Sequence, residues 1–163
     1  PSIVELLHFS ESACAAGLSA LQAGAAILTD TEMAAAAIRP MVKRTLGVPV
    51  RTVLEWAPTL APSGSTRTAL GMLAAWGELS ATRPTPVVLI GSAPTALEVL
   101  LTQVEAGSPR PSLVIGMPVG FVGVAESKRQ LAESGLDQIR LEGSRGGAGL
   151  VAAAVNALLR AAK

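Results

Sequence analysis

The chain alternates between short apolar runs and longer stretches in which apolar residues recur with helical spacing. Each short run is bounded by turn-forming or helix-capping residues, which is typical of a β-strand. The runs that we predict to be strands are residues 25–28, 48–54, 86–90, 112–115 and 138–141. The predicted helices are residues 10–23, 31–45, 66–79, 94–105, 125–134 and 147–162. This alternation predicts a mostly parallel sheet with helices on both faces.

Local signals sharpen this α/β interpretation. The runs VVLI and SLVI are apolar throughout, so we expect them to be central strands buried on both faces. Asp30 and Thr31 follow the first predicted strand as candidate helix caps, and Pro40 should kink or break the helix that contains it. Glycines at positions 47, 107 and 135 stand where helices should end. We therefore predict one domain over residues 1–163, a three-layer α/β/α sandwich around a five-stranded, mostly parallel sheet, with an exposed loop at residues 57–65.

Composition narrows the range of partners. Half of the 163 residues are hydrophobic and 15% are charged, which indicates a folded domain with a substantial core. Thirteen basic residues against 12 acidic ones give a net charge of +1. The chain therefore has no excess of positive charge that would attract the phosphate backbone of a nucleic acid. Aromatic residues make up only 2% of the chain, too few to build stacking platforms for bases. We predict no nucleic-acid partner.

The single cysteine and the uncharged segments favour a cytoplasmic protein without a membrane partner. Cys14 excludes an internal disulfide, and in its alanine-rich helical context we expect a buried, inert thiol rather than a nucleophile. The uncharged residues 12–29 contain Gln22, two glycines and several hydroxyls, so we interpret them as helix plus strand rather than as a membrane span. No signal-peptide pattern opens the chain.

Three glycine-containing loops follow predicted parallel strands, at the edge of the sheet where ligands usually bind. They are residues 91–96, 116–123 and 143–149. A glycine after a strand often serves only a positive φ angle or close packing. Three such loops on one edge favour an anion-binding surface, because free backbone amides and helix N-termini attract negative charge. The chain lacks a Walker lysine and a GxGxxG after its first strand, so the predicted ligand is an anion other than a nucleotide.

Few titratable residues are available for catalysis. His8 is the only histidine, and we expect a half-buried structural role for it rather than a catalytic one. Arg67, which lies between two threonines at the start of a predicted helix, is the best candidate to bind a carboxylate. Lys128 and Arg145 are further candidates, and a solvated surface position is an equally good interpretation of each of these three cations.

Each of the three loops belongs to a longer segment, and the three segments can be compared with known protein families. These are IGSAPTALEVLL at residues 90–101, LVIGMPVGFVGVAESKRQL at 113–131 and SRGGAGLVAAAVNALL at 144–159. Together with residues 6–38 and 65–73, they resemble the signature segments of the precorrin-8X methylmutase family, also called precorrin isomerase, in the same order. The most specific piece is PVGFVGxAESK, and the resemblance covers nearly the whole chain.

The resemblance implies an isomerase of cobalamin biosynthesis with a flavodoxin-like fold. Such an enzyme moves a methyl group from C-11 to C-12 of precorrin-8X by a 1,5-sigmatropic shift and yields hydrogenobyrinic acid, or cobyrinic acid when the substrate is cobalt-precorrin-8. The resemblance further implies a homodimer with active sites near the subunit interface, and no cofactor or metal ion.

A tetrapyrrole (corrin) ligand is flat, apolar and fringed with carboxylates, so its site needs apolar walls and distributed anion donors. Met33, Val119 and Phe121 are candidates for the walls, and Arg67, Lys128 and Arg145 for the carboxylates. The remaining substrate-binding candidates lie in or beside the loops and are Thr66, Ser92, Thr95 and Gly120.

The chain departs from the family in one important respect. The family's catalytic histidine stands in a motif R-x-x-H-x-x-G-D, which the spacing places shortly before Pro1, and His8 does not match it. We therefore expect the chain to lack its natural N-terminal segment and to contain no catalytic residue of this motif. Ser92 replaces a usual asparagine, and EGSR at 142–145 replaces a more basic run. The alternatives are a non-catalytic corrinoid-binding protein and, from the fold alone, a nucleotide-binding module, against which the missing fingerprints argue.

Overall fold

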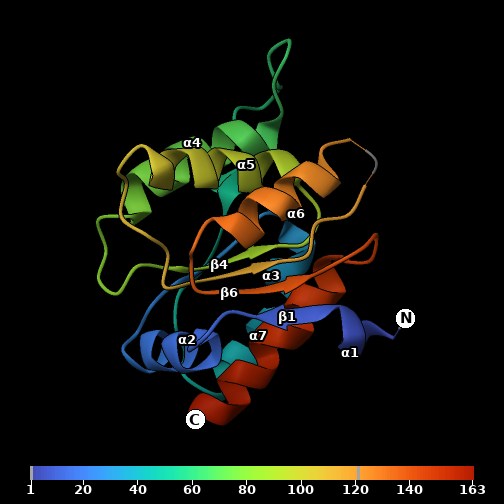
Figure 1. Ribbon diagram of the computed structural model, residues 1–163. Helices are drawn as coiled ribbons and strands as arrows, with labels where there is room; N and C mark the ends of the chain where they lie inside the picture. Colours follow the sequence, from blue (N-terminus) through green and yellow to red (C-terminus); the bar gives the residue numbers. More distant parts are fainter. Residues whose placement is uncertain (1, 121) are drawn as a thin grey trace.

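In the computed structural model, which describes residues 2–120 and 122–163, a six-stranded sheet lies between two layers of helices (Figure 1). The strands are β1 (Leu7–Phe9), β2 (Ile27–Thr29), β3 (Val50–Thr52), β4 (Val87–Ile90), β5 (Leu113–Gly116) and β6 (Gln138–Leu141). Their order across the sheet is β1-β6-β5-β4-β2-β3. All neighbouring pairs are parallel except β1 and β6. Without β1 this is the flavodoxin-like order, in which the direction of winding reverses between β2 and β4.

Two groups of helices cover the two faces of the sheet (Figure 1). The helices are α1 (Ile3–Leu6), α2 (Ala13–Gln22), α3 (Glu32–Arg44), α4 (Arg67–Leu79), α5 (Pro94–Glu105), α6 (Val124–Glu133) and α7 (Ala148–Ala162), with a 3-10 turn η1 (Val53–Trp56). The helices α2, α3 and α7 pack on one face, and α4, α5 and α6 pack on the other. Among the helices of the described residues, none is long and apolar enough to cross a membrane.

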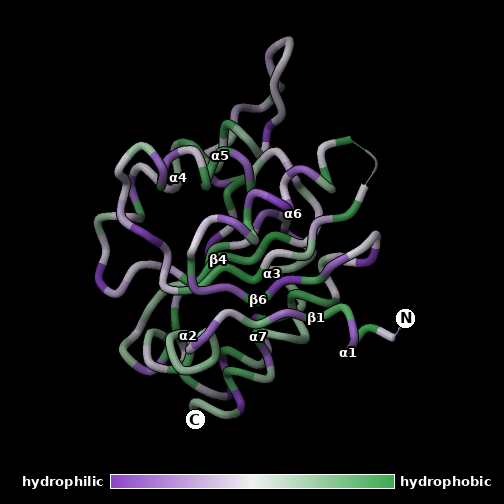
Figure 2. The backbone as a smooth tube through the Cα atoms, in the orientation of Figure 1, coloured by the Kyte–Doolittle hydropathy of each residue, from purple (hydrophilic) through white to green (hydrophobic). Residues whose placement is uncertain are grey.

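Strand side chains alternate between two separate hydrophobic cores. Leu89 and Ile115 point into the core under α2, α3 and α7, whereas Val88 and Val114 point into the core under α4, α5 and α6. Because both faces are covered, the central strands are apolar at every position, and Figure 2 shows them as a hydrophobic centre. Trp76 is fully buried in the second core and donates its indole N–H to the Pro109 carbonyl at 3.1 Å.

The structure confirms each predicted strand and helix, with ends shifted by at most a few residues. The largest shift is at residues 48–54, where the strand gives way to η1 after Thr52. Gly47, Gly107 and Gly135 have positive φ angles just beyond helix ends, as predicted. The loop at residues 57–65 is exposed at its tip and projects from the sandwich near the start of α4 (Figure 1).

Two predictions about the backbone were wrong. The sheet has six strands rather than five, because β1 pairs with β6 at its edge; a three-residue strand is too short to show a period in the sequence. The break predicted at Pro40 is also absent, because α3 continues through that residue, whereas the alternative of a kink stays a prediction. Pro40 and Ala36, whose carbonyl loses its helical N–H partner, are both exposed, so water can hydrate that carbonyl.

Two predictions about single side chains were also wrong. Cys14 is exposed rather than buried, because it lies on the outer side of α2 while Ala13 and Gly17 face the core. His8 is exposed rather than half-buried, because it lies on the edge strand β1. Both residues belong to the N-terminal region that packs against β6 and α7, where sequence periodicity is weakest.

Candidate active site

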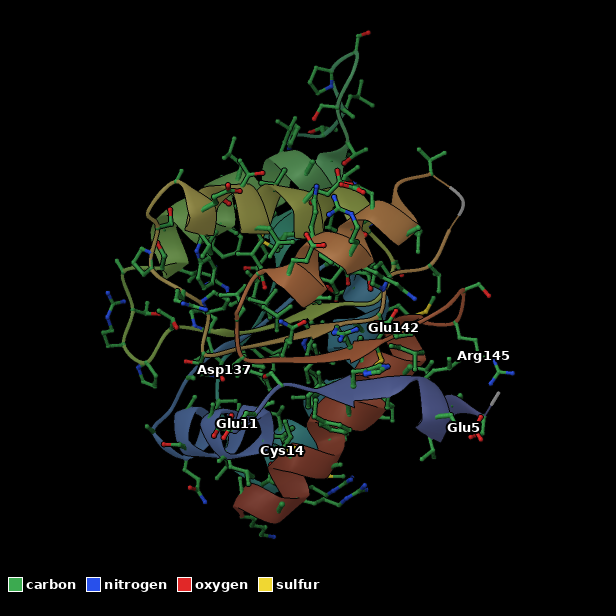
Figure 3. The ribbon with its side chains drawn as sticks, in the orientation of Figure 1. Glu5, Glu11, Cys14, Asp137, Glu142 and Arg145 are labelled. Carbon is green, nitrogen blue, oxygen red and sulfur yellow. The ribbon has the colours of Figure 1, made fainter. Side chains whose placement is uncertain are left out.

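The loops that follow β2, β4, β5 and β6 meet at one edge of the sheet, which we call the carboxyl edge. The first turns of α3, α5, α6 and α7 all begin there. Figure 3 shows Glu5, Glu142 and Arg145 at this end of the molecule, and Glu11, Cys14 and Asp137 at the other. The predicted ligand-binding loops therefore do lie together.

The loop after β4 is held by the carboxylate of Asp30, which directly follows β2. Its Oδ2 accepts the N–H groups of Ser92 and Ala93, both at 2.8 Å, and its Oδ1 accepts that of Gly91 at 3.2 Å. Asp30 is completely buried. Burial raises the pKa of the Asp30 carboxyl, and the three amide donors act in the opposite direction. Thr31, the neighbouring cap candidate, caps α3 by accepting the N–H of Ala34.

This arrangement corrects the predicted anion site. The loop amides that we expected to bind an external anion are already hydrogen-bonded to a buried carboxylate of the chain itself. The same negative charge lies before the first turn of α5, where it interacts favourably with the helix dipole. A substrate carboxylate at this loop would therefore find these three N–H groups already in use.

The first turns of α4 and α5 are joined by two threonines. Thr66 caps α4 by accepting the N–H of Ala69 at 3.0 Å, and its hydroxyl lies 3.0 Å from that of Thr95 on α5. Both threonines line a shallow pocket of about 370 Å3, together with Glu98. Arg67 is exposed beside this pocket, and its Nε donates to the Pro58 carbonyl at 2.8 Å. That bond connects the projecting loop to α4.

The loop after β6 is held by Lys128 of α6. The Nζ of Lys128 donates to the carbonyl oxygens of Gly143 and Arg145 at 2.7 and 2.9 Å. The residue is 7% exposed, and burial lowers the pKa of its ammonium group. Of the three protons on the ammonium group, two are used by the loop. Lys128 is thus first of all a loop-binding residue, whereas we predicted either a ligand for substrate carboxylates or a solvated surface position.

The same loop also packs tightly against the loop after β5. The N–H of Gly147 donates to the Met117 carbonyl at 2.9 Å. A Cβ atom on Gly146 would lie 2.1 Å from the same oxygen, so only glycine fits there. The loops after β5 and β6 therefore form one platform, to which Val119 contributes a half-buried side chain.

A second pocket, of about 520 Å3, lies between α6 and this platform. It is lined by Gly120, Val124, Lys128 and Ser144 among others, so it combines an apolar helix face with a buried cation. Glu142 also lines it and forms an ion pair with Arg140. A slightly larger polar pocket of about 570 Å3 lies at the opposite edge of the sheet, near Arg110, and contains none of the predicted site residues. We assign the site to the carboxyl edge.

The predicted substrate-binding residues fall into two groups. Thr66, Arg67 and Thr95 gather at the pocket between α4 and α5, with Ser92 next to them in the Asp30-bound loop. The second group lies at or beside the pocket between α6 and the platform and comprises Val119, Gly120, Lys128 and Arg145. The Arg145 side chain is exposed (Figure 3).

Two predicted wall residues lie outside these groups. Met33 is 73% exposed on the first turn of α3, the helix layer opposite to both pockets. Phe121 lies outside the described residues. Among the residues that the structure does describe, no three His, Cys, Asp or Glu side chains come together where they could hold a metal ion.

Comparison with known proteins gives the carboxyl edge a chemical context. The family profile described as precorrin-8X methylmutase matches residues 1–161. The chain belongs to the precorrin-8X methylmutase family. This confirms the resemblance drawn from the loop segments, and the matched range includes each of the loops described above.

Individual relatives agree with the profile. The precorrin-8X methylmutase of Pseudomonas aeruginosa is 45% identical over 96% of this chain and 75% of its own length. The cobalt-precorrin-8 methylmutase of Synechocystis is 42% identical over 90% of this chain and 65% of its own length. The chain thus spans about two thirds to three quarters of the length of these methylmutases.

The fold agrees as well. A crystal structure of the precorrin-8X methylmutase from Thermus thermophilus superposes with a TM-score of 0.83 at 39% identity, covering 98% of this chain and 78% of that one. Nothing in the comparisons supports the alternative of a non-catalytic corrinoid-binding protein.

Sequence reasoning missed the role of Asp30, which it took for a helix cap. One signal was available: an acidic residue directly after the first strand of a parallel sheet faces the neighbouring β4 loop across the point where the winding reverses. A glycine-initiated loop there offers several N–H groups to such a carboxylate.

Proposed function

We propose that the protein is a methylmutase of cobalamin biosynthesis, which moves a methyl group from C-11 to C-12 of precorrin-8X and produces hydrogenobyrinic acid. With cobalt already inserted, the corresponding reaction converts cobalt-precorrin-8 into cobyrinic acid. The observation that carries the proposal is that the family match extends over residues 1–161 and that its most specific segment, PVGFVGVAESK, leads from the platform into α6.

The two pockets suit the two kinds of surface of a corrin. The pocket beside α6 offers an apolar helix face to the ring, and the third proton of Lys128 and the exposed Arg145 are available for its carboxylates. Arg67 supplies a further cation at the pocket between α4 and α5. A Cβ atom on Gly123, at the start of α6, would lie 3.3 Å from Glu98 of that pocket, so the two sites adjoin. We propose that the macrocycle lies across both.

The rearrangement demands little nucleophilic chemistry. The bond from the methyl carbon to C-11 breaks as the bond to C-12 forms, so substrate and product have the same mass. The protein has to orient the ring and supply a proton or hydrogen bond to it. We propose that this donor is the histidine of the R-x-x-H-x-x-G-D motif ahead of Pro1. Ser2, which caps α1, lies at the carboxyl edge because β1 is antiparallel to β6, so a segment ahead of it would enter the site there.

We also propose that the protein is a homodimer. Large apolar side chains are strongly exposed around the carboxyl edge, with exposed fractions of 82% for Leu60 and 89% for Val122. A second copy of the chain would bury such groups. Light scattering should give twice the mass of the chain, and Leu60→Asp should shift the equilibrium toward monomer. The cytoplasmic location and the absence of a nucleic-acid partner stay predictions.

The decisive experiment is an assay of the full-length protein, including the residues encoded upstream of Pro1. Incubated separately with precorrin-8X and with cobalt-precorrin-8, it should change the visible absorbance of at least one of them while the mass of the compound stays constant. The preferred compound identifies the natural substrate. Absence of conversion with either would refute the proposed function.

A matched control starts the protein at Pro1. We expect this shortened protein to bind hydrogenobyrinic acid but to convert almost no precorrin-8X. Normal conversion by the shortened protein would show that the catalytic group lies within residues 1–163.

A further inference from the structure

The carboxylate of Asp30 is the one fully buried acidic group at the carboxyl edge among the described residues, and the proposed chemistry does not use it. We propose that Asp30 is a positioning residue of the methylmutase site. Its carboxylate holds the first turn of α5 in place and, through the contact of Thr95 with Thr66, the first turn of α4. This inference rests on the proposed function, and Asp30 itself does not touch the substrate.

The first step is the attachment of Asp30 to the sheet. Its own N–H donates to the Leu89 carbonyl at 3.1 Å, which extends the β2–β4 pairing by one residue. Its backbone therefore belongs to the hydrogen-bonded pairing of β2 with β4. The carboxylate connects this part of the sheet to the loop at residues 91–93.

The second step is that α5 has no N-terminal cap of its own. Its capping residue, Ala93, has no side chain that can accept a hydrogen bond, and Pro94 in the first turn has no N–H. The N–H groups of Gly91, Ser92 and Ala93 all point at the Asp30 carboxylate instead. Asp30 thus anchors, from the end of β2, the three residues that lead into α5.

The third step leads from this loop to the ligand-binding residues. Thr95 lies in the first turn of α5, and its hydroxyl is 3.0 Å from that of Thr66, the capping residue of α4. Both hydroxyls line the pocket beside Arg67. Gly91 meanwhile lies against the start of α7, since a Cβ there would be 2.8 Å from the Ala148 nitrogen. A shift of the loop would therefore move the walls of the proposed site.

Asp30→Asn tests this role with almost no change of volume. The carboxamide has one acceptor oxygen, and its NH2 group would face an N–H group, so at least one buried loop amide loses its partner. Thr85→Val is the matched control, because Thr85 is also buried and its hydroxyl donates to the Arg110 carbonyl at 2.7 Å, at the opposite end of β4.

We expect Asp30→Asn to accelerate amide hydrogen exchange at Ser92 and Ala93 and to lower kcat/KM about a hundredfold, since a misplacement of about 1 Å costs that much. Thr85→Val should lower the melting temperature but leave these amides and kcat/KM unchanged. If Asp30→Asn frees the loop amides and kcat/KM stays at the wild-type value, Asp30 is only structural and the inference is wrong.

Two further measurements apply if Asp30→Asn does not fold. In the wild-type protein the amides of Ser92 and Ala93 should exchange slowly despite their place in a loop, and fast exchange would overturn the inference. Thr95→Val should leave the exchange of the Ser92 and Ala93 amides slow but lower kcat/KM. An unchanged kcat/KM in this variant would also overturn the inference. If the wild-type protein converts no substrate, the proposed function fails, whereas the exchange measurements still test the geometry.

Discussion

Two loops of the carboxyl edge are held by buried charges of opposite sign. In the Asp30-bound loop, residues 91–93, three N–H groups donate to a carboxylate. In the Lys128-bound loop, residues 143–147, two carbonyl oxygens accept from an ammonium group. Each ion is paired with the backbone groups that its sign requires, so neither charge is buried without partners.

The difference between the two loops lies in what remains for a ligand. The Asp30 carboxylate is completely buried and its two oxygens already bind three donors. The Lys128 ammonium has a third proton and lines a pocket. The Asp30-bound loop thus serves the geometry of the site, whereas the Lys128-bound loop can serve both geometry and binding. A glycine-rich loop after a parallel strand is therefore no anion site until its amides are shown to be free.

The strongest disturbance of the Lys128-bound loop should come from a methyl group at Gly146. The Cβ of Gly146→Ala would lie 2.1 Å from the Met117 carbonyl oxygen, so the two loops of the platform must separate. We expect the free energy of unfolding to fall by about 3 kcal/mol. Urea unfolding measures it.

Gly149→Ala is the matched control for this substitution. Gly149 is exposed near the start of α7, and a Cβ there meets no atom within 4 Å. Alanine should raise stability by up to about 1 kcal/mol through its higher helix propensity. Equal effects of the two substitutions would contradict the close contact at Gly146.

Removing the ammonium group of Lys128 should destabilise the Lys128-bound loop less than the methyl group at Gly146 does. Lys128→Met fills a similar volume but leaves the Gly143 and Arg145 carbonyls without their charged donor. We expect a loss of about 2 kcal/mol in the free energy of unfolding, because hydrogen bonds to charged groups contribute about 1.5–3 kcal/mol. Thermal and urea unfolding both report it.

Lys43→Met, an exposed lysine on α3, provides the comparison and should change stability little. If Lys128→Met is as stable as the wild type and still binds product equally well, the lysine neither holds the loop nor serves the ligand.

A substitution of Arg67 tests carboxylate binding near the Asp30-bound loop. Because the N–H groups of the Asp30-bound loop are already in use, we expect the carboxylate contact near α4 to depend on this exposed guanidinium. Arg67→Ala should weaken binding of hydrogenobyrinic acid by about tenfold, or roughly 1.4 kcal/mol, and reduce its salt dependence. The melting temperature of the free protein should barely move, since the bond to Pro58 is exposed.

Titration followed by visible absorbance measures this affinity, with Arg160→Ala at the far end of α7 as the control. Unchanged affinity together with a lower melting temperature would make Arg67 a structural residue instead.

The smallest effect is expected at His8. It is exposed on the edge strand β1, opposite Arg140 of β6, and lies outside the family's histidine motif. His8→Ala in the full-length protein should keep turnover within about tenfold, which corresponds to about 1.4 kcal/mol of barrier. A loss of about a thousandfold in a folded protein would identify His8 as the catalytic base.

Sequence reasoning found the segments of the site better than its contacts. The loops after β4, β5 and β6 were placed correctly at one edge, because turn-forming residues and apolar runs are local signals. The bonds of Lys128 to the loop after β6 and of Asp30 to the amides at residues 91–93 were not foreseen, since no sequence pattern marks these backbone partners. The predicted role of Lys128 in binding a carboxylate stays a prediction. Met33 lies at the same edge, in the first turn of α3, but in the helix layer opposite to both pockets, so its place at the wall of the site stays a prediction.

By itself, the sequence determined the alternation of strands and helices, the helix ends at Gly47 and Gly135, and the membership of the family. These depend on neighbours within a few residues or on the order of segments along the chain. Only the tertiary structure decided that β1 pairs with β6 and that the Asp30 carboxylate holds the loop that leads into α5. Both contacts join residues more than 60 positions apart, and their hydrogen bonds form only after the sheet has brought the partners together.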